Sequence, residues 1–427
     1  MILPVELAAI YADDPGFVFL DAALEDRFAG NFSLLAHHPH ESIQGSNWQV
    51  LGDFLGKWLP QVPDTETSRT SKWHHPAEKG ALIGFIEYDG AYQFAWYPEV
   101  GIFDHARNTW LRWPAWADST FLQSSPIPTS PPDETEITFH PEISREQYCT
   151  MVQRAQDYIC AGDIYQVNLT HRLSGEISTS GFPFYQRLRM ISPVPYGAYL
   201  NFGERQVYSA SPECFLRYEG QEMMTRPIKG TRPRGKTPEE DARFAQELKS
   251  SAKEAAELTM ITDLERNDLG QVAEFGSVQV KELLHLETFA QVFHQVSTVT
   301  GKRRADISVL EMLRACFPGG SITGAPKKRA REIIAELESV PRGLYTGAIG
   351  YFGQNGGQFS IAIRTVIRDG SKIHFHVGSG IVADSLPEAE YEETLAKAAG
   401  ILQAAMGKNC FTLNTPRPGL PGTFSST

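Results

Sequence analysis

The sequence lacks any long uninterrupted run of apolar residues. A membrane-spanning helix needs about 18 consecutive residues that are mostly apolar, and no segment of the 427 residues approaches that length. The first residues, MILPVELAAIYADDPG, have no basic start, and Glu6 interrupts their apolar stretch. A secretory signal peptide needs both a basic start and an unbroken apolar core. We therefore expect neither a membrane span nor an export signal.

Cysteine is also scarce. The chain has five cysteines, an odd number, at the widely separated positions 149, 160, 214, 316 and 410. None of these spacings is typical of a metal site or of the disulfide framework of a small secreted protein. Free thiols in a reducing compartment are the simplest interpretation, so we expect a cytoplasmic protein.

Positive charge is in deficit. The chain has 39 Lys and Arg against 51 Asp and Glu, a formal net charge of −12, and no long basic run. Nucleic acids and acidic membrane surfaces attract basic patches, so we expect neither as a partner. The composition itself is ordinary, with 41% hydrophobic and 21% charged residues, which excludes wholesale disorder, collagen and coiled coil.

Length and local composition divide the chain into regions. A chain of 427 residues exceeds one average domain. Residues 1–123 are rich in aromatic residues and contain short apolar runs typical of strands. Residues 124–136 hold four prolines and predict a linker, and residues 409–427, rich in Pro, Gly, Ser and Thr, predict a disordered tail. Residues 137–408 form the main region, which can pack with residues 1–123 as one structural domain.

The main region carries clear helix and strand signals. Ser144 and Gln147 fit a capping box that opens a helix, and Gly162 ends it. The pattern predicts further helices over 238–260, 326–339 and 387–405. It predicts strands over 344–353, 359–368 and 372–377, the last two joined by a turn at Asp369-Gly370. The class is therefore α+β, a large mixed or antiparallel sheet with helices outside.

The segment Arg226–Lys236, RPIKGTRPRGK, is a basic loop and a candidate for a catalytic role. Five of its eleven residues are basic, and most such loops are simply solvated. Here, however, the preceding strands bring Glu213 and Lys229 into the same region. A lysine that loses solvation becomes a nucleophile or a base, and a nearby carboxyl group can serve as a general acid.

Two acidic pairs stand at helical spacing. Glu254 and Glu257 are three residues apart in one predicted helix, and Glu390 and Glu393 repeat the spacing in another. Each pair alone has an ordinary explanation, since an exposed helix face is often acidic and acidic residues stabilise the start of a helix. If the two pairs converge, however, their oxygen atoms suit Mg²⁺.

Two further features favour an anionic ligand. Gly378 and Gly380 leave backbone amides accessible to an anion. Arg364 is predicted on the small-residue face of the strand 359–368, opposite Phe359, Ile361, Ile363 and Ile367, and a buried arginine needs an anionic partner. His294 alone is better explained as a core or interface histidine. The residues thus indicate a small dianionic ligand, Mg²⁺ and an activated lysine.

These motifs, taken together, resemble a known family. Residues 140–405 are similar to the chorismate-utilising enzymes, which include component I of anthranilate synthase and the isochorismate and salicylate synthases. The resemblance implies the sheet sandwich of the anthranilate synthase component I fold. The strings that carry it are GDIYQVN (162–168), SPE (211–213), PIKGTRPRG (227–235), DLERNDLG (263–270), GGSITGAPK (319–327), YTGAIGY (345–351), IAIRT (361–365) and GSGIVADSLPEAEYEET (378–394).

Two positions indicate a place within the family. Lys229 stands where anthranilate synthases usually have Ala, and it resembles the lysine of aminodeoxychorismate synthase component I. Gln166 stands where the isochorismate and salicylate enzymes have a water-activating Lys, which implies ammonia as the nucleophile. The sequence has no GxCxG glutaminase motif, so the resemblance implies a separate glutaminase subunit as the ammonia source. The alternatives are anthranilate synthase component I and a non-catalytic chorismate-binding subunit.

The resemblance also implies a role for each residue. Lys229 would attack C2 of chorismate with Glu213 as the acid, and ammonia would then give 4-amino-4-deoxychorismate for 4-aminobenzoate and folate synthesis. Glu257 and Glu393 would bind Mg²⁺ directly, with Glu254 and Glu390 nearby. His294 would be a further catalytic residue, near the reacting ring. The remaining substrate contacts would come from Gln166, Ser321, Tyr345, Arg364, Gly378 and Gly380.

Some members of the family also hold tryptophan in the N-terminal region, at a turn similar to Pro193–Gly197, PVPYG. The other residues of that site, around Asp21 and 27–33, match the family poorly here. The sequence therefore does not decide whether this chain binds tryptophan.

Overall fold

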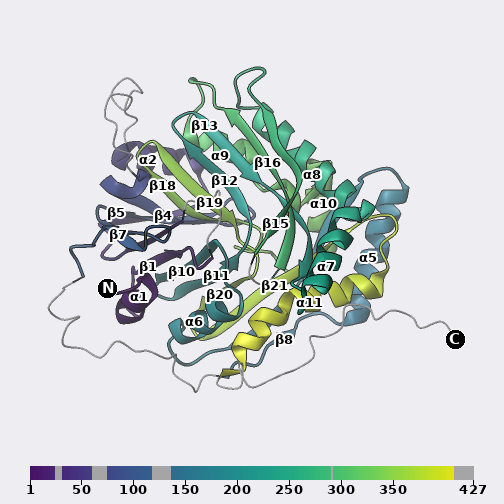
Figure 1. Ribbon diagram of the computed structural model, residues 1–427, viewed down its shortest axis with the longest axis horizontal. Helices are drawn as coiled ribbons and strands as arrows, with labels where there is room; N and C mark the ends of the chain where they lie inside the picture. The colour runs from purple at the N-terminus through teal and green to yellow at the C-terminus, as the bar shows by residue number, and fades with distance from the viewer. Residues whose placement is uncertain (25–30, 60–74, 118–135, 290–291, 408–427) are drawn as a thin grey trace.

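In the computed structural model, strands from early and late parts of the chain form two large sheets that pack face to face (Figure 1). The structure describes residues 1–24, 31–59, 75–117, 136–289 and 292–407. Every strand pair among these residues is antiparallel. The α+β sandwich that the sequence predicted is thereby confirmed, with antiparallel rather than mixed pairing.

The described part of the chain contributes eleven strands to one sheet, sheet A, and ten to the other, sheet B. Sheet A has the order β17 (Gly324–Ala325), β9 (Gln166–Glu176), β21 (Lys372–Ile381), β20 (Thr365–Asp369), β11 (Arg205–Ser211), β10 (Tyr196–Phe202), β1 (Val18–Asp21), β2 (Phe32–Ala36), β6 (Val100–Asp104) and β7 (Thr109–Arg112), with β8 (His140–Pro141) beside β9. Sheet B has the order β14 (Ile228–Pro233), β16 (Val292–Lys302), β13 (Glu222–Arg226), β12 (Cys214–Glu219), β19 (Gly356–Ile361), β18 (Ala348–Gly353), β4 (Ala81–Ile86), β5 (Tyr92–Tyr97) and β3 (Glu41–Gly45), with β15 (Gln279–Thr288) beside β16.

Helices cover the outer faces of both sheets (Figure 1). The described helices are α1 (Pro4–Tyr11), α2 (Trp48–Trp58), α5 (Arg145–Cys160), α6 (Phe182–Ile191), α7 (Pro238–Ser250), α8 (Ala252–Gly270), α9 (Val309–Cys316), α10 (Lys327–Leu337) and α11 (Pro387–Ala405), with short 3₁₀ turns η1 (Pro76–Lys79) and η2 (Gly320–Ile322). None of them is long and apolar enough to cross a membrane.

Burial explains the layering. A core between the sheets joins residues of sheet A, such as Leu34 and Leu200, to residues of sheet B, such as Ile83 and Ile349. A second core packs α1, α6 and α11 on the outside of sheet A, and a third packs α2, α8 and α9 on the outside of sheet B. Burying these apolar faces is the main stabilising contribution to such a fold.

Strands of the first 123 residues belong to both sheets. β1 pairs with β10 in sheet A, and β4 pairs with β18 in sheet B. Of the predicted linker, 124–136, only residue 136 is described, and the predicted tail, 409–427, lies outside the described residues.

Several local predictions are confirmed. Ser144 Oγ accepts from the amide of Gln147, and the Gln147 side chain accepts from the amide of Ser144, so the capping box opens α5. Gly162, with a φ of 82°, follows the helix where the sequence placed its end. The helix predicted over 387–405 has those bounds in α11.

Two predicted elements are each divided in the structure. The helix predicted over 238–260 is two helices, because Ser251 adopts an extended conformation and caps α8, which continues to Gly270. The strand predicted over 359–368 is also two. β19 ends in sheet B at Ile361 and β20 begins in sheet A at Thr365, with Arg364 at a φ of 49° between them.

The second division overturns the predicted alternation of side chains. Phe359 and Ile361 pack on the outside of sheet B, whereas Ile367 packs in the core between the sheets. These residues therefore do not share one face. Arg364 instead occupies the crossover from one sheet to the other, a position that no alternation of residues within a single strand could predict.

Candidate active site

The candidate site lies where β14 of sheet B meets the β9–β21 edge of sheet A. Lys229, in β14, is half-buried, and its Nζ lies 3.4 Å from the carbonyl oxygen of Ser321 in η2. A Cβ atom built on Gly380 of β21 would lie 3.9 Å from this Nζ and would overlap the side-chain amide of Gln166 in β9. A larger residue at position 380 would displace the Gln166 amide, so the lysine, the glycine and the glutamine form one wall.

Glu213 lies beside this wall with a carboxyl group that the protein does not fully compensate. Its side chain is buried, and Oε1 has no hydrogen-bond partner among the described residues. Burial raises its pKa, while the hydroxyl of Ser321 and the charges of Lys229 and Arg364 act to lower it. A carboxyl group with a raised pKa keeps its proton at higher pH, which suits a general acid.

Arg364 brings an unpaired positive charge to the same place. Its guanidinium makes no hydrogen bond or ion pair with the described residues, although its backbone carbonyl accepts from Ala210. Burial lowers its pKa, and the charge of Glu213 acts in the opposite direction. A half-buried guanidinium with five free donors is a strong site for a carboxylate.

The amides of Gly378 and Gly380 face away from the neighbouring strand. Gly378 lies opposite Thr170 of β9, and Gly380 lies opposite Asn168. Both β9 residues direct their backbone groups to partners outside the β9–β21 ladder, so these are non-hydrogen-bonded pairs. The other edge of β21 pairs with β20 only as far as Phe375. Both glycine amides can therefore donate to an anion at this open edge.

Two further buried polar atoms have no hydrogen-bond partner among the described residues. They are Oε1 of Gln166 and Oγ of Ser321, whose residues are 2% and 6% exposed. A buried polar atom without a partner is destabilising, by roughly 1–3 kcal/mol. Several such atoms at one place indicate that a ligand, rather than the protein, completes their hydrogen bonds.

His294 and Tyr345 lie at the edges of the site. Burial lowers the pKa of His294 to about 3, helped by the charge of Arg364, so its ring is neutral. Its Nδ1 contacts the hydroxyl of Thr231 at 2.9 Å. The Tyr345 ring is buried and stacks on His376, with ring centroids 5.2 Å apart. His294 is thus a satisfied neighbour of the charged groups.

The four glutamates predicted to bind a metal are only partly gathered. Burial raises the pKa of Glu257, Lys229 opposes this, and the charges of Glu254 and Glu393 raise it further, so these carboxylates lie close enough to repel. Burial also acts to raise the pKa of Glu393, but the Lys397 ammonium, 2.7 Å away, outweighs it and lowers the pKa.

The outer two glutamates have protein partners. Glu254 lies 3.4 Å from the Arg232 guanidinium. Glu390 accepts a hydrogen bond of 2.7 Å from Ser385, while its Oε2 has no partner in the part of the chain that the structure describes. Among the described residues, no three His, Cys, Asp or Glu side chains lie close enough to hold a metal ion together.

One buried acid near the site was not predicted. Glu265, on α8, is buried, accepts a hydrogen bond of 2.6 Å from Thr225, and has no cationic partner within 4.0 Å among the described residues. Burial raises its pKa to about 8, and repulsion from Glu213 contributes. The signal was present, because Leu258, Ile261 and Glu265 fall on one face of the helix.

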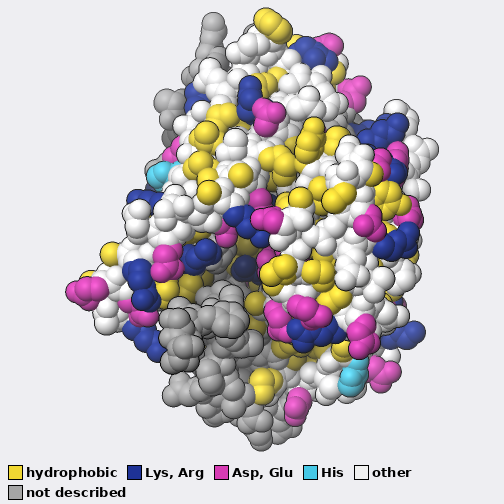
Figure 2. Space-filling model, turned by 90° about the vertical axis from the view of Figure 1, so that its right-hand side faces the viewer, with side chains coloured by type: hydrophobic (Ala, Val, Ile, Leu, Met, Phe, Trp, Pro, Cys, Tyr) yellow, Lys and Arg dark blue, Asp and Glu magenta, His cyan; other side chains and the backbone are white. Residues whose placement is uncertain are grey.

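Figure 2 views the side of the molecule on which α5, α7, α10 and α11 lie in Figure 1. It shows a hollow near the middle of this face, with acidic and basic side chains gathered around it. The strands and helices that carry the predicted site residues meet on this side of the molecule. A small charged ligand could approach the site from there.

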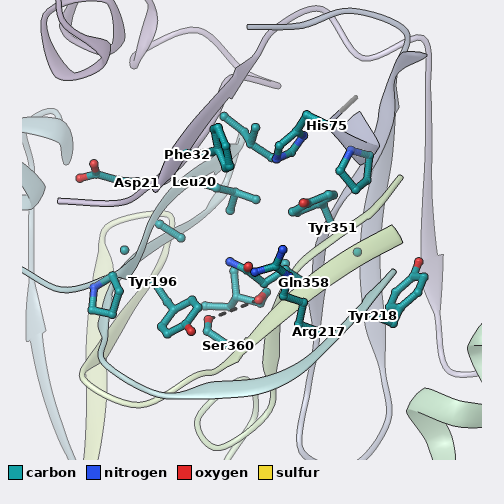
Figure 3. Close-up of a pocket in the computed structure, with 18 of the residues that line it drawn as sticks. Leu20, Asp21, Phe32, His75, Tyr196, Arg217, Tyr218, Tyr351, Gln358 and Ser360 are labelled. Atoms are coloured by element: carbon teal, nitrogen blue, oxygen red, sulfur yellow. Dashed lines mark hydrogen bonds between the residues drawn. The ribbon is translucent and has the colours of Figure 1, made fainter. Parts of the chain in front are cut away.

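A separate cavity lies between the sheets (Figure 3). Leu20 and Tyr196 of sheet A and Arg217 and Gln358 of sheet B line its opposite walls. None of the predicted catalytic residues lines it. It includes Asp21 and part of the PVPYG turn, where the sequence left tryptophan binding undecided, and residues 25–30 of that region lie outside the described residues.

The fold and this arrangement of charged groups match a family of enzymes. The family model described as "chorismate binding enzyme" matches residues 23–403, most of the chain. The chain therefore belongs to the chorismate-binding enzyme family, whose members act on chorismate.

Individual relatives carry two names. The chain is 45% identical to "Anthranilate synthase component 1" of Methanothermobacter thermautotrophicus, over 94% of this chain and 92% of the relative. It is 37% identical to "Aminodeoxychorismate synthase component 1" of Bacillus subtilis, over 89% and 90%. Among the most similar curated relatives, anthranilate synthases are the more numerous. The crystal structure of anthranilate synthase component I from Streptococcus pneumoniae superposes with a TM-score of 0.75 at 29% identity, covering 89% of this chain and 94% of that chain.

Proposed function

We propose that this chain is an aminodeoxychorismate synthase component I, which converts chorismate and ammonia to 4-amino-4-deoxychorismate. The observation that carries the proposal is the place of Lys229, whose amine lies against Ser321 and Gly380 and beside the buried carboxyl group of Glu213. Anthranilate synthases resemble this chain closely but usually have Ala at that position, so they would have no amine at this point of the site.

The charges of the site suit the two carboxylates of chorismate. Arg364, with Tyr345 nearby, would bind the enolpyruvyl carboxylate through charge-assisted hydrogen bonds. The amides of Gly378 and Gly380 and the hydroxyl of Ser321 would receive the ring carboxylate. The ligand would thereby satisfy polar atoms that have no partner among the described residues.

The reaction would proceed in two substitutions. The Lys229 amine attacks C2 of the ring, both ring double bonds shift, and the C4 hydroxyl leaves as water after taking a proton from Glu213. Ammonia then attacks C4, both double bonds shift back, and Lys229 is expelled as a neutral amine. The new ammonium group at C4 returns one proton to Glu213. Chorismate and ammonia thus give 4-amino-4-deoxychorismate and water, with the enzyme restored.

Glu257 and Glu393 fit the ligand set of Mg²⁺, because this ion commonly binds one or two carboxylates and completes its shell with water and substrate oxygens. Their mutual repulsion is what a bound cation would relieve. Glu254 and Glu390 would act through water. Bound there, the ion would supply positive charge for the ring carboxylate.

Nitrogen would come from a partner. The sequence lacks a glutaminase motif, and relatives are named as component 1 of a synthase, so we propose a separate glutaminase subunit that supplies ammonia. The product would serve 4-aminobenzoate and folate synthesis. We place the reaction in the cytoplasm, where the scattered thiols would remain reduced.

Anthranilate synthase component I is the second candidate, favoured by the names of most relatives. A non-catalytic chorismate-binding subunit is a third, but such a subunit would be expected to have lost Lys229 or a metal-binding glutamate. All of these residues are present.

The decisive experiment is a product assay. The pure chain is incubated with chorismate, Mg²⁺ and an ammonium salt at alkaline pH, and a pyridoxal-phosphate lyase that releases 4-aminobenzoate is then added. The proposal expects 4-aminobenzoate only after addition of the lyase, and no turnover when glutamine replaces ammonium. Fluorescent anthranilate formed without the lyase would establish the second candidate instead.

A further inference from the structure

A single buried ion pair connects the segments that form the candidate substrate site. Glu338 directly follows α10, Arg342 lies four residues later, and their side chains are 6% and 1% exposed. Arg342 Nε donates to one carboxylate oxygen of Glu338 at 2.9 Å, and Nη2 donates to the other at 2.7 Å. This two-point contact fixes the plane of the guanidinium and the direction of its remaining donors.

On one side the pair holds β9. Oε1 of Glu338 accepts from the backbone amide of Thr170 at 2.9 Å and from its hydroxyl at 3.0 Å. Arg342 Nη2 donates to the backbone carbonyl of Asn168 at 2.7 Å. The pair thus supplies partners for backbone groups of β9 that point away from β21, as they do in the non-hydrogen-bonded pairs of an antiparallel ladder. The two glycine amides of β21 that lie opposite them point to the open edge of the sheet in the same register.

On the other side the pair holds two connecting segments. Arg342 Nη1 donates to the carbonyl of Ile322 at 3.0 Å and to the hydroxyl of Thr346 at 3.2 Å. Ile322 adjoins Ser321, and Thr346 adjoins Tyr345. One guanidinium therefore bonds to three separate segments, each of which carries or adjoins a group assigned above to a chorismate carboxylate.

We infer that the Arg342–Glu338 pair positions the carboxylate-binding groups of the substrate site without touching the substrate. It holds β9, η2 and the turn before β18 at fixed distances from one another, so that Ser321, Tyr345 and the glycine amides of β21 face one ligand. The inference rests on the proposed function only in taking chorismate as that ligand.

Stability alone is a poor explanation for such a pair. Taking two charges out of water is costly, and well-packed apolar residues of similar volume often stabilise a core as well as an ion pair does. Apolar residues cannot, however, supply the directed donors that join β9 to Ile322 and Thr346. Lysine cannot supply them either, because it carries one ammonium in place of a planar fork.

The test is the Arg342→Lys variant, which keeps the charge but loses the fork. With saturating ammonium and Mg²⁺, we expect its KM for chorismate to rise at least tenfold while kcat stays within about threefold. Loss of substrate binding that is equal in the ground state and the transition state raises KM and spares kcat. The dissociation constant of chorismate, measured by calorimetry, should rise by a similar factor.

Two further variants keep the inference testable if Arg342→Lys folds poorly. The double variant Arg342→Met, Glu338→Leu leaves no unpaired buried charge and fills the same space, and it should fold yet bind chorismate at least tenfold more weakly. Thr170→Val removes only the hydroxyl contact to Glu338 and should raise KM about twofold. The matched control is Glu336→Gln, which breaks the exposed pair between Arg154 and Glu336 on α10 and should leave KM unchanged.

The outcomes separate this inference from the proposed reaction. Calorimetry reports chorismate binding even if the wild-type chain forms anthranilate or no product, so failure of the proposed reaction leaves the comparison intact. A folded Arg342→Lys or double variant that binds chorismate as tightly as the wild type would overturn the inference. A Glu336→Gln control with the same rise in KM would also overturn it, because the effect would then not be specific to the buried pair.

Discussion

The buried guanidinium of Arg342 and the half-buried guanidinium of Arg364 have opposite surroundings. Arg342 makes five hydrogen bonds to a carboxylate, two backbone carbonyls and a hydroxyl. Arg364, at the crossover between the sheets, makes none with the described residues, and it faces Glu213, which has an unpartnered oxygen of its own. The same side chain is thus fully compensated in one region and uncompensated in the other.

This difference separates a framework from a binding site. A buried charge that is paired within the protein holds chain segments together. When one partner is removed, the other charge stays buried without water or an opposite charge to stabilise it. A charge without a partner destabilises the free protein, and pairing it with a ligand contributes most to the free energy of binding. Three of the buried polar atoms that have no partner among the described residues, on Glu213, Ser321 and Gln166, lie together at the site of Lys229.

The strongest effect is expected from Lys229, the amine on the uncompensated side. Lys229→Ala should lower formation of 4-amino-4-deoxychorismate by on the order of a thousandfold or more, because the variant lacks the proposed nucleophile. Chorismate binding should change little, since the carboxylate-binding groups remain. Coupled 4-aminobenzoate formation measures the first quantity and calorimetry measures the second.

Mass spectrometry supplies the complement to the Lys229 experiment. Wild-type enzyme quenched during turnover should carry an added mass on the peptide that contains Lys229. If Lys229→Ala forms product at the wild-type rate, the assignment of a covalent intermediate is wrong, and the lysine contributes charge alone.

A smaller effect is expected from the carboxylates proposed to bind Mg²⁺. Glu257→Gln and Glu393→Gln should each lower activity by roughly a hundredfold, since a bound ion stabilises developing charge by several kcal/mol. EDTA should abolish wild-type activity, and added Mg²⁺ should restore it. The control is Glu392→Gln, which removes an exposed carboxylate next to Glu393 and should have no effect. Full activity in metal-free buffer would contradict the assignment.

The sequence predicted correctly those elements whose ends depend on interactions between neighbouring residues. The bounds of α11 follow from Pro387 at the first turn and the apolar spacing after it, and the α5 capping box needs only residues 144–147. The crossover at Arg364 was missed because it depends on a contact between two sheets. No glycine marks its left-handed backbone, which glycine adopts more readily than other residues.

The candidate site shows the same limit. Lys229 and Glu213 were placed together because they lie near one another in sequence, whereas the approach of Gly380 and Gln166 to Lys229 came only from a resemblance to known enzymes. Glu338 and Arg342, four residues apart, look like an ordinary surface pair in sequence. Their burial cannot be read from the sequence, and it is burial that lets this pair connect β9 to the neighbouring segments.

Arg364 and Arg342 can be compared directly by neutralising each. Arg364→Gln should raise the KM for chorismate roughly tenfold or more, because a charge-assisted hydrogen bond contributes about 1.5–3 kcal/mol. Its free energy of unfolding should stay the same or rise. Arg342→Gln should instead lose about 3–5 kcal/mol of stability, because it leaves Glu338 buried and unpaired. Urea denaturation of both variants gives the comparison, and equal losses of stability would remove the distinction between the two regions.

Glu265 lies between these two extremes, since Thr225 donates to it but no cationic group lies within 4.0 Å of it among the described residues. Burial raises its pKa to about 8 in the folded state, against an ordinary value of 4.5. Between these values the folded state holds a proton that the unfolded state releases, so the contribution of Glu265 to stability falls as pH rises from about 5 to about 8. The loss is several kcal/mol, because each unit of pKa difference corresponds to about 1.4 kcal/mol.

Glu265→Gln should therefore remove this loss. The free energy of unfolding of the variant, measured in urea at pH 5 and pH 9, should fall less with pH than that of the wild type, so that the variant is relatively more stable at pH 9. The control is Glu336→Gln, which neutralises an exposed carboxylate and should leave the pH dependence unchanged. Parallel curves for Glu265→Gln and the wild type would mean that Glu265 is ionised in the folded protein, and it would then belong with the compensated framework.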